Sequence, residues 1–225
     1  MAKSETHTSA VKGSVAKQRL EAHRTAIETA ERLLKEADAE RAPEQREYLT
    51  GLALYQLQEY ELAQKHLLAS FNMRESPETA GRLAVSYWRA NDLDTAESWI
   101  KRAISLDPKG SIHTQIADTK PSYLAILSQI LLSAGQADSA ADSAEAALSL
   151  NPGDVAALSV TASTRLARGD GKGALEALDA ALKHAPNFIG EHMKREQGVA
   201  RDLLAANVNL RPFAADLSAI NRLVI

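Results

Sequence analysis

The chain has 225 residues, of which 45% are hydrophobic and 4% aromatic, and its formal net charge is -3. This length and apolar content predict a folded protein of one or two domains, because such a chain buries a sizeable core. The small net charge gives no electrostatic footprint for nucleic acid or anionic lipid, and the lack of Cys excludes disulfides, thiolate metal sites and Cys nucleophiles.

The N-terminal region is predicted to be a tail followed by a helix. Residues 1–12 are polar and are expected to be disordered. Over residues 13–43 the helical spacing of apolar residues predicts one long helix or a degenerate first repeat. The residues with this spacing are Leu20, Ala26, Ile27, Ala30, Leu33, Leu34 and Ala37.

The first residues lack an apolar run of signal-peptide length, and no stretch of the sequence approaches the length of a membrane span. We therefore expect a soluble, cytoplasmic protein.

Three stretches in the second half of the chain share one skeleton. AESWIKRAISLDP, AADSAEAALSLNP and ALEALDAALKHAP begin at Ala96, Ala140 and Ala174. In each, an Ala is followed seven residues later by Ala and five residues after that by Pro. Weaker copies begin at Ala63 and Ala30, so the successive separations are 33, 33, 44 and 34 residues. A period near 34 is typical of a helix-turn-helix repeat.

Each copy is preceded by an apolar segment that ends in a turn. Asn91, Gly135 and Gly169 occupy the same place in the three units, and Asn and Gly tolerate the left-handed conformation that ends a helix. The closing Pro stops the second helix of each unit. The recurring Ala residues are expected where two helices cross closely, because a larger side chain would push the helices apart.

These features resemble the tetratricopeptide repeat (TPR) family, whose repeat has a Leu-Gly/Ala pair and a Tyr in its first helix, two Ala in its second helix and a closing Pro. The unit that matches best does so through Leu83, Ala84, Tyr87, Ala96, Ala103 and Pro108. The next two units match through Leu127, Ala140, Ala147 and Pro152, and through Ala162, Ala174, Ala181 and Pro186. An earlier unit shares Gly51, Tyr60 and Ala63 but departs at Ser70 and Glu75.

The resemblance implies an all-α fold, a right-handed TPR superhelix (α-solenoid) of antiparallel helix pairs with an N-terminal helix and C-terminal capping helices. An ordinary helical bundle with accidental Ala spacing is the alternative. The solenoid is expected over residues 44–187 as four repeats, with an insertion at 109–120 that is either a plain spacer or a binding loop. Residues 188–225 are expected to form a capping helix and an apolar C-terminal helix. That last segment packs on the capping helix, docks into a neighbouring molecule or marks the cut edge of a longer protein.

No sequence pattern indicates catalysis. The six His residues are scattered without metal-ligand spacing, and the sequence has no nucleophile elbow, HExxH or phosphate-cradling loop. The glycine-rich stretch at 168–173 lies at the turn position shared with Asn91 and Gly135. We therefore expect a protein that is not an enzyme and that uses no metal or cofactor.

The TPR resemblance implies that the first helices of successive repeats line a concave groove for a protein or peptide partner. The groove set, meaning the residues expected to face that groove, comprises Tyr48, Leu52, Tyr55, Arg82, Val85, Trp88, Arg89, Gln129, Leu132, Ser163 and Leu166. The chaperone adaptors of this family hold a terminal carboxylate with Lys, Arg and Asn, and here Arg89, with Arg82 beside it, is the one match. The aromatic members instead favour a helical or extended segment with hydrophobic anchors, although for Trp88 and Tyr55 core packing between repeats is the alternative.

The function expected from these features is that of an adaptor or scaffold that binds a segment of a partner protein in the concave groove. One alternative is a structural scaffold that self-assembles into a homo-oligomer through its terminal helices. The other is an accessory or targeting domain of an enzyme complex.

Overall fold

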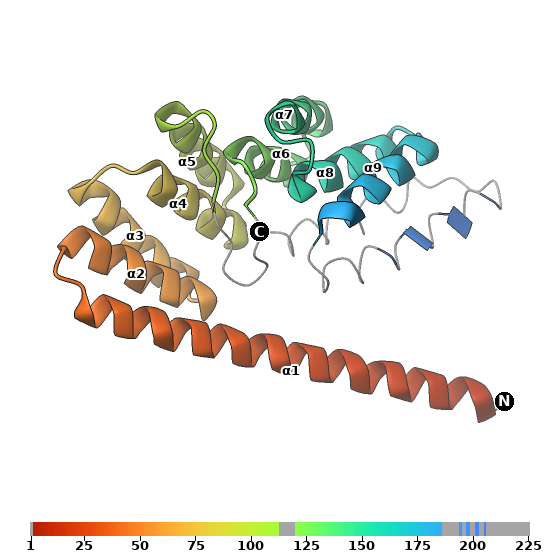
Figure 1. Ribbon diagram of the computed structural model, residues 1–225, viewed down its shortest axis with the longest axis horizontal. Helices are drawn as coiled ribbons and strands as arrows, with labels where there is room; N and C mark the ends of the chain where they lie inside the picture. Colours follow the sequence, from red (N-terminus) through yellow and green to blue (C-terminus); the bar gives the residue numbers. More distant parts are fainter. Residues whose placement is uncertain are drawn as a thin grey trace. The chain divides into compact units, whose positions relative to one another are not determined.

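The computed structural model describes residues 2–112 and 120–185, with Lys194, Gln197, Gly198, Arg201, Asp202 and Ala205, and the side chains of its first helix from Leu20 onward. Within these residues the regular elements are α-helices, as expected (Figure 1). They are α1 (Ala2–Ala39), α2 (Pro43–Gln56), α3 (Tyr60–Met73), α4 (Pro77–Arg89), α5 (Leu93–Leu106), α6 (Tyr123–Ser133), α7 (Ala137–Leu150), α8 (Val155–Ala167) and α9 (Gly171–His184).

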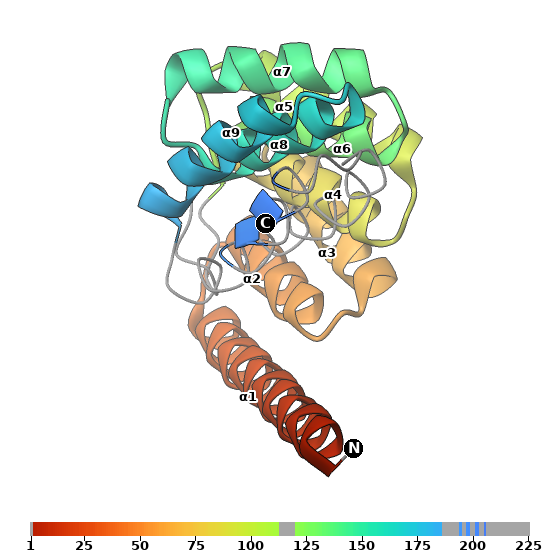
Figure 2. The same ribbon diagram turned by 90° about the vertical axis from the view of Figure 1, so that its right-hand side faces the viewer.

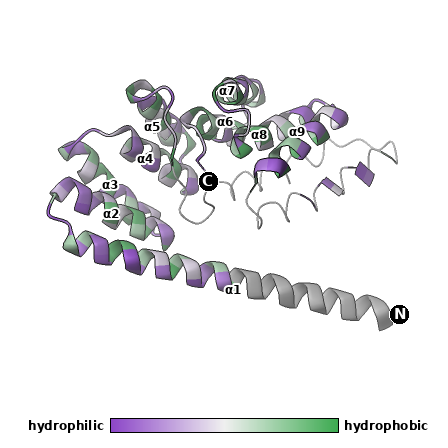
Figure 3. Ribbon diagram, in the orientation of Figure 1, coloured by the Kyte–Doolittle hydropathy of each residue, from purple (hydrophilic) through white to green (hydrophobic). Residues whose placement is uncertain are grey.

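The chain divides into two compact units, unit 1 (Met1–Met73) and unit 2 (Arg74–Ile225). The helices after α1 pack in consecutive pairs, α2 with α3 in unit 1, and α4 with α5, α6 with α7 and α8 with α9 in unit 2. Hydrophobic and hydrophilic residues alternate along the helices (Figure 3), as expected for helices that bury one face. The division between the units falls inside residues 44–187, and the domain boundaries given above stay predictions.

The N-terminal helix is longer than expected. α1 is a single helix of 38 residues, and it includes residues 2–12, where the sequence predicts a disordered tail. That stretch contains Ala, Lys and Glu and has no Pro, so none of its residues terminates a helix. α1 packs against α2, and its buried residues Ala30, Leu33 and Ala37 follow the helical spacing.

The turns inside the helix pairs confirm the predicted left-handed positions. Asn91, Gly135 and Gly169 have φ angles of 65°, 76° and 83°, and each is the second residue after the end of a first helix. Gln58 takes the same place in unit 1 with φ of 64°. Gln carries no strong signal for this conformation, so the sequence does not predict the turn at this residue.

The recurring Ala residues are buried inside the helix pairs. Ala63, Ala96, Ala103, Ala140, Ala147, Ala174 and Ala181 are each at most 1% exposed. In unit 1 the approach is closer still, because a Cβ built on Gly51 of α2 would lie 2.7 Å from Cγ of Leu67 and 3.2 Å from the carbonyl oxygen of Ala63. Small residues therefore set the distance between paired helices.

The two ends of the 109–120 insertion are hydrogen-bonded to each other. The Ile112 N–H donates to the Pro121 carbonyl and the Tyr123 N–H donates to the Gly110 carbonyl, both at 3.0 Å. Ser111 and Ser122 form an isolated antiparallel bridge between these bonds. The insertion therefore starts and ends at one place, and residues 113–119 between its ends lie outside the described part.

This base of the insertion packs on the first helix of unit 2. A Cβ on Gly81 of α4 would lie 2.7 Å from Cδ1 of Ile112 and 2.8 Å from Cε1 of Tyr123. Both side chains are buried, and burial raises the pKa of Tyr123 to about 12. Gly81 thus provides the space in which the insertion is anchored.

The predicted capping helix and apolar C-terminal helix lie mostly outside the described residues. Two of the described residues, Gln197 and Arg201, contact α9. Gln197 is buried and its side-chain amide donates to the carboxylate of Asp179. Arg201 forms an ion pair of 3.0 Å with the same carboxylate.

Replacing Ala147 with Leu should destabilise unit 2. The larger side chain overpacks the contact between α7 and its neighbours, at a cost of about 1–3 kcal/mol. Ala146→Leu is the matched control, because Ala146 is exposed on the same helix. Thermal or urea unfolding of both variants tests this, and equal stability of Ala147→Leu and wild type would contradict the packing described here.

The anchoring of the insertion predicts a coupling between Gly81 and Ile112. Gly81→Ala should be more unfavourable in wild type than in an Ile112→Ala background, because removal of the Ile112 side chain makes room for the new Cβ. A double-mutant cycle by urea unfolding should give a coupling energy of about 0.5–3 kcal/mol. Additive effects of the two substitutions would show that Ile112 does not pack over Gly81.

Candidate protein-binding surface

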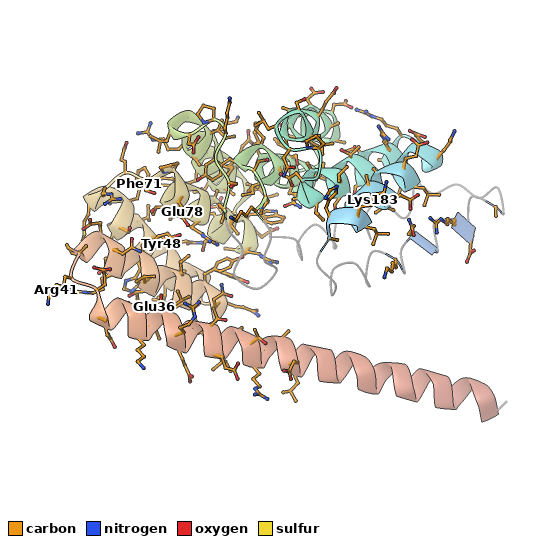
Figure 4. The ribbon with its side chains drawn as sticks, viewed as in Figure 1. Glu36, Arg41, Tyr48, Phe71, Glu78 and Lys183 are labelled. Carbon is orange, nitrogen blue, oxygen red and sulfur yellow. The ribbon has the colours of Figure 1, made fainter. Side chains whose placement is uncertain are left out.

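The groove set is distributed over four first helices. α2 carries Tyr48 (labelled in Figure 4), Leu52 and Tyr55 in unit 1, whereas α4, α6 and α8 carry the remaining members in unit 2. In unit 2, α6 packs against both α4 and α8, so α4, α6 and α8 form one continuous row, called here the first-helix row (Figure 1). The structure brings together the members on this row within unit 2, and those of α2 belong to unit 1.

Most of the groove set is buried. The buried members are Tyr48, Leu52, Arg82, Val85, Trp88, Gln129, Ser163 and Leu166. The half-buried members are Tyr55, Arg89 and Leu132. The part of the set that is accessible at the surface is therefore narrower than the sequence suggests, and on the first-helix row it lies at the C-terminal ends of α4 and α6.

Trp88 links two neighbouring first helices. Its indole Nε1–H donates to the Ser133 hydroxyl at 2.9 Å, and that hydroxyl donates to the Gln129 carbonyl oxygen at 2.9 Å. Because the ring is buried and its N–H is satisfied, Trp88 joins α4 to α6. The structure places it in the packing between repeats, which is the alternative that the sequence left open for this residue.

The two arginines of α4 differ in accessibility. The Arg89 guanidinium lies 5.8 Å from the centre of the Trp88 ring, within the range of a cation–π interaction. Arg82 is buried, whereas Arg89 is half-buried at the end of the helix. The two guanidinium groups therefore do not form an equally exposed pair of the kind that a carboxylate clamp requires.

The hydroxyls of α8 are used within the helix. Ser163 donates to the Ser159 carbonyl at 3.0 Å, and Ser159 donates to the Val155 carbonyl at 2.8 Å. Each bond spans one turn, which is the usual way in which a helix accommodates a buried Ser. The Ser163 hydroxyl donor is therefore used inside α8, and Ser163 adds only a small buried side chain to this part of the row.

In unit 1 the aromatic members belong to the α2–α3 pair. The Tyr55 and Tyr60 rings are 5.7 Å apart and tilted by 57°, a favourable geometry for aromatic side chains. Tyr48 and Leu52 are buried on the same helix.

A polar contact that the sequence analysis missed joins the starts of α6 and α8. The Asp154 carboxylate accepts from the Ser122 N–H at 2.9 Å and from its hydroxyl at 3.0 Å, and also from the Ala156 N–H at 3.1 Å. Burial raises the pKa of Asp154, and these donors oppose that shift by favouring the carboxylate. An Asp ahead of a helix is a common N-cap, but no local signal identifies Ser122 as the partner of Asp154, or Ser133 as the partner of Trp88.

Among the side chains that the structure describes, no group of three or more His, Cys, Asp or Glu residues is arranged to hold a metal ion. None of the described helices is long and apolar enough to cross a membrane.

Solved structures with a similar fold were found. A thermophilic TPR protein from Thermus thermophilus aligns over 84% of this chain and 95% of its own, with 19% identity and a TM-score of 0.62. MamA aligns over 77% of this chain and 93% of its own, with 17% identity and a TM-score of 0.54. The APC/C hetero-tetramer Cut9-Hcn1 aligns over 69% of this chain with 19% identity and a TM-score of 0.55, and the alignment spans 30% of the Cut9-Hcn1 chain.

At these identities the likeness to solved structures shows the fold alone, and the comparison with curated proteins gave no significant match. Two tetratricopeptide repeat models match the sequence itself, over residues 48–111 and 131–191, which together make up more than half of the chain. With its all-α fold of paired helices, the chain belongs to the tetratricopeptide repeat family.

Proposed function

We propose that this chain is a non-enzymatic adaptor that binds a helical or extended segment of a partner protein along the first-helix row of unit 2. TPR domains are generally protein–protein interaction modules, and one of the similar structures is part of a hetero-tetramer.

The observation that carries this proposal is the continuity of the first-helix row. α6 contacts α4 and α8, the Trp88–Ser133 bond fastens the first of these contacts, and the Asp154–Ser122 bonds fasten the second. A surface held in this way loses little conformational entropy when a partner binds, so more of the contact energy remains as affinity.

The accessible end of the row supplies an apolar anchor. Leu132 is half-buried on α6, next to the exposed Ser133, and Arg89 lies at the end of α4. A partly accessible aliphatic side chain and a partly accessible guanidinium at the ends of two neighbouring first helices suit an amphipathic segment whose apolar residues dock on the row. We therefore expect substitution of Leu132 to weaken partner binding more than substitution of any other residue of the row.

The experiment compares wild type, Leu132→Glu and Leu150→Glu as baits in a lysate of the source cells. Leu150, which is 45% exposed at the end of the second helix α7, is the matched control. Loss of an interface hot spot of at least about 2 kcal/mol lowers affinity at least about 30-fold. A client retained by wild type and Leu150→Glu, and lost by Leu132→Glu, is the expected result.

Circular dichroism must first show that both variants remain helical. Trp88→Ala is unsuitable as a probe, because it also removes the bond that joins α4 to α6. If Leu132→Glu retains every client that wild type retains, or if Leu150→Glu is the variant that loses them, the first-helix row is not the binding surface.

A further inference from the structure

α1 has two apolar faces, and α2 covers one of them. The covered face contains Ala30, Leu33 and Ala37. The second contains Leu20, Ile27 and Leu34, which are 70%, 38% and 39% exposed. A spacing of seven residues keeps these three side chains on one side of the helix, so they form a narrow exposed line, called here the α1 stripe.

The length of α1 makes this exposure costly. α1 has 38 residues, whereas α2 and α3 have 14 each, and both ribbon views show α1 extending well past these two helices (Figures 1 and 2). A helix stretch without tertiary packing is marginally stable in water. Packing of a second helix against the α1 stripe would stabilise the extended part.

The charged residues beside the α1 stripe are those that a second copy of α1 would complement, so a second copy is the helix that we expect to pack there. Arg24 lies three residues before Ile27, Glu31 lies four residues after it, and both are exposed. On a helical projection both fall on the same side of the stripe, away from the face covered by α2. Arg24 also donates to Glu28 at 2.9 Å, which holds its guanidinium on that side.

An antiparallel pair of α1 helices buries the apolar side chains of the stripe and also brings opposite charges together. When Ile27 lies opposite Ile27 of the second copy, Leu20 faces Leu34, and Arg24 faces Glu31. The two-fold symmetry of such a pair repeats each contact. A parallel pair in register would instead place the two copies of Arg24, and the two copies of Glu31, at the same height but on opposite sides of the stripe, so neither residue would face an opposite charge.

We propose that α1 is a docking surface for a second copy of this chain, which pairs with it antiparallel across Leu20, Ile27 and Leu34. The interface is small, so the dimer is weak and depends on concentration. This proposal rests on unit 1 and is independent of partner binding by the first-helix row.

Sedimentation velocity from micromolar to millimolar concentration tests the dimer. Wild type is expected to shift from monomer to dimer, and Ile27→Glu is expected to weaken the association at least tenfold, because it places two carboxylates at the centre of the pair. Leu62→Glu is the matched control, since Leu62 is 43% exposed on α3 of the same unit. A wild type that stays monomeric throughout, or equal weakening by both variants, would overturn the proposal.

The antiparallel register is tested by charge exchange. Glu31→Arg alone should weaken the dimer, because it sets a second guanidinium against Arg24 of the other copy. The double variant Arg24→Glu/Glu31→Arg should restore association to near the wild-type level. Failure of the double variant to recover would contradict the pairing of these two residues.

Cysteine cross-linking gives the same register directly, because the natural chain has no Cys. Under mild oxidation Ile27→Cys should form a disulfide dimer with itself, whereas Leu20→Cys should cross-link efficiently when mixed with Leu34→Cys. Self-cross-linking of Leu20→Cys at the rate of that mixture would indicate a parallel pair and overturn the antiparallel proposal.

Discussion

Paired helices approach one another closely at small residues, and this packing sets the geometry of the helix pairs. Ala96, Ala140 and Ala174 recur at one position in successive second helices, and each is at most 1% exposed. Ala at these positions lets two helices approach within the distance that ridges-into-grooves packing requires. Because the same residue type recurs with the repeat, each pair has a similar geometry, and the first helices of unit 2 come to lie beside one another.

The repeat alone does not fix the contacts between neighbouring first helices. The Trp88–Ser133 bond between α4 and α6, and the Asp154–Ser122 bonds between α6 and α8, come from residues that do not recur. The pairs are thus built from a periodic apolar pattern, whereas the surface that we propose for partner binding is held by individual polar contacts. Such contacts are costly to leave unsatisfied when buried, which favours one fixed arrangement of the row.

The sequence predicts the helix pairs well because their signals are local. The turn residues Asn91, Gly135 and Gly169 and the buried Ala positions follow from spacing and backbone preference, and the structure has them where they were expected. The burial of the groove set was not predictable in this way. Whether Trp88 faces a partner or a neighbouring helix depends on Ser133, which is 45 residues away in sequence.

The contact between the ends of the 109–120 insertion and α4 was likewise not predictable from local sequence signals. Ile112 is fully buried against Gly81 of α4, yet neither residue has a neighbour in sequence that indicates the contact. The helical tail at residues 2–12 differs from the prediction for a further reason. Polar composition argues against burial, but it does not by itself prevent a chain of good helix formers from continuing a helix.

The most direct test of partner binding is amide hydrogen exchange of this protein, measured alone and saturated with a client obtained by capture. We expect protection on binding to be concentrated at the C-terminal ends of α4 and α6, around Arg89 and Leu132, with little change in the second helices α5 and α7. Protection confined to α5, α7 or α1, with no change along α4, α6 and α8, would contradict the claim that the first-helix row recognises the partner.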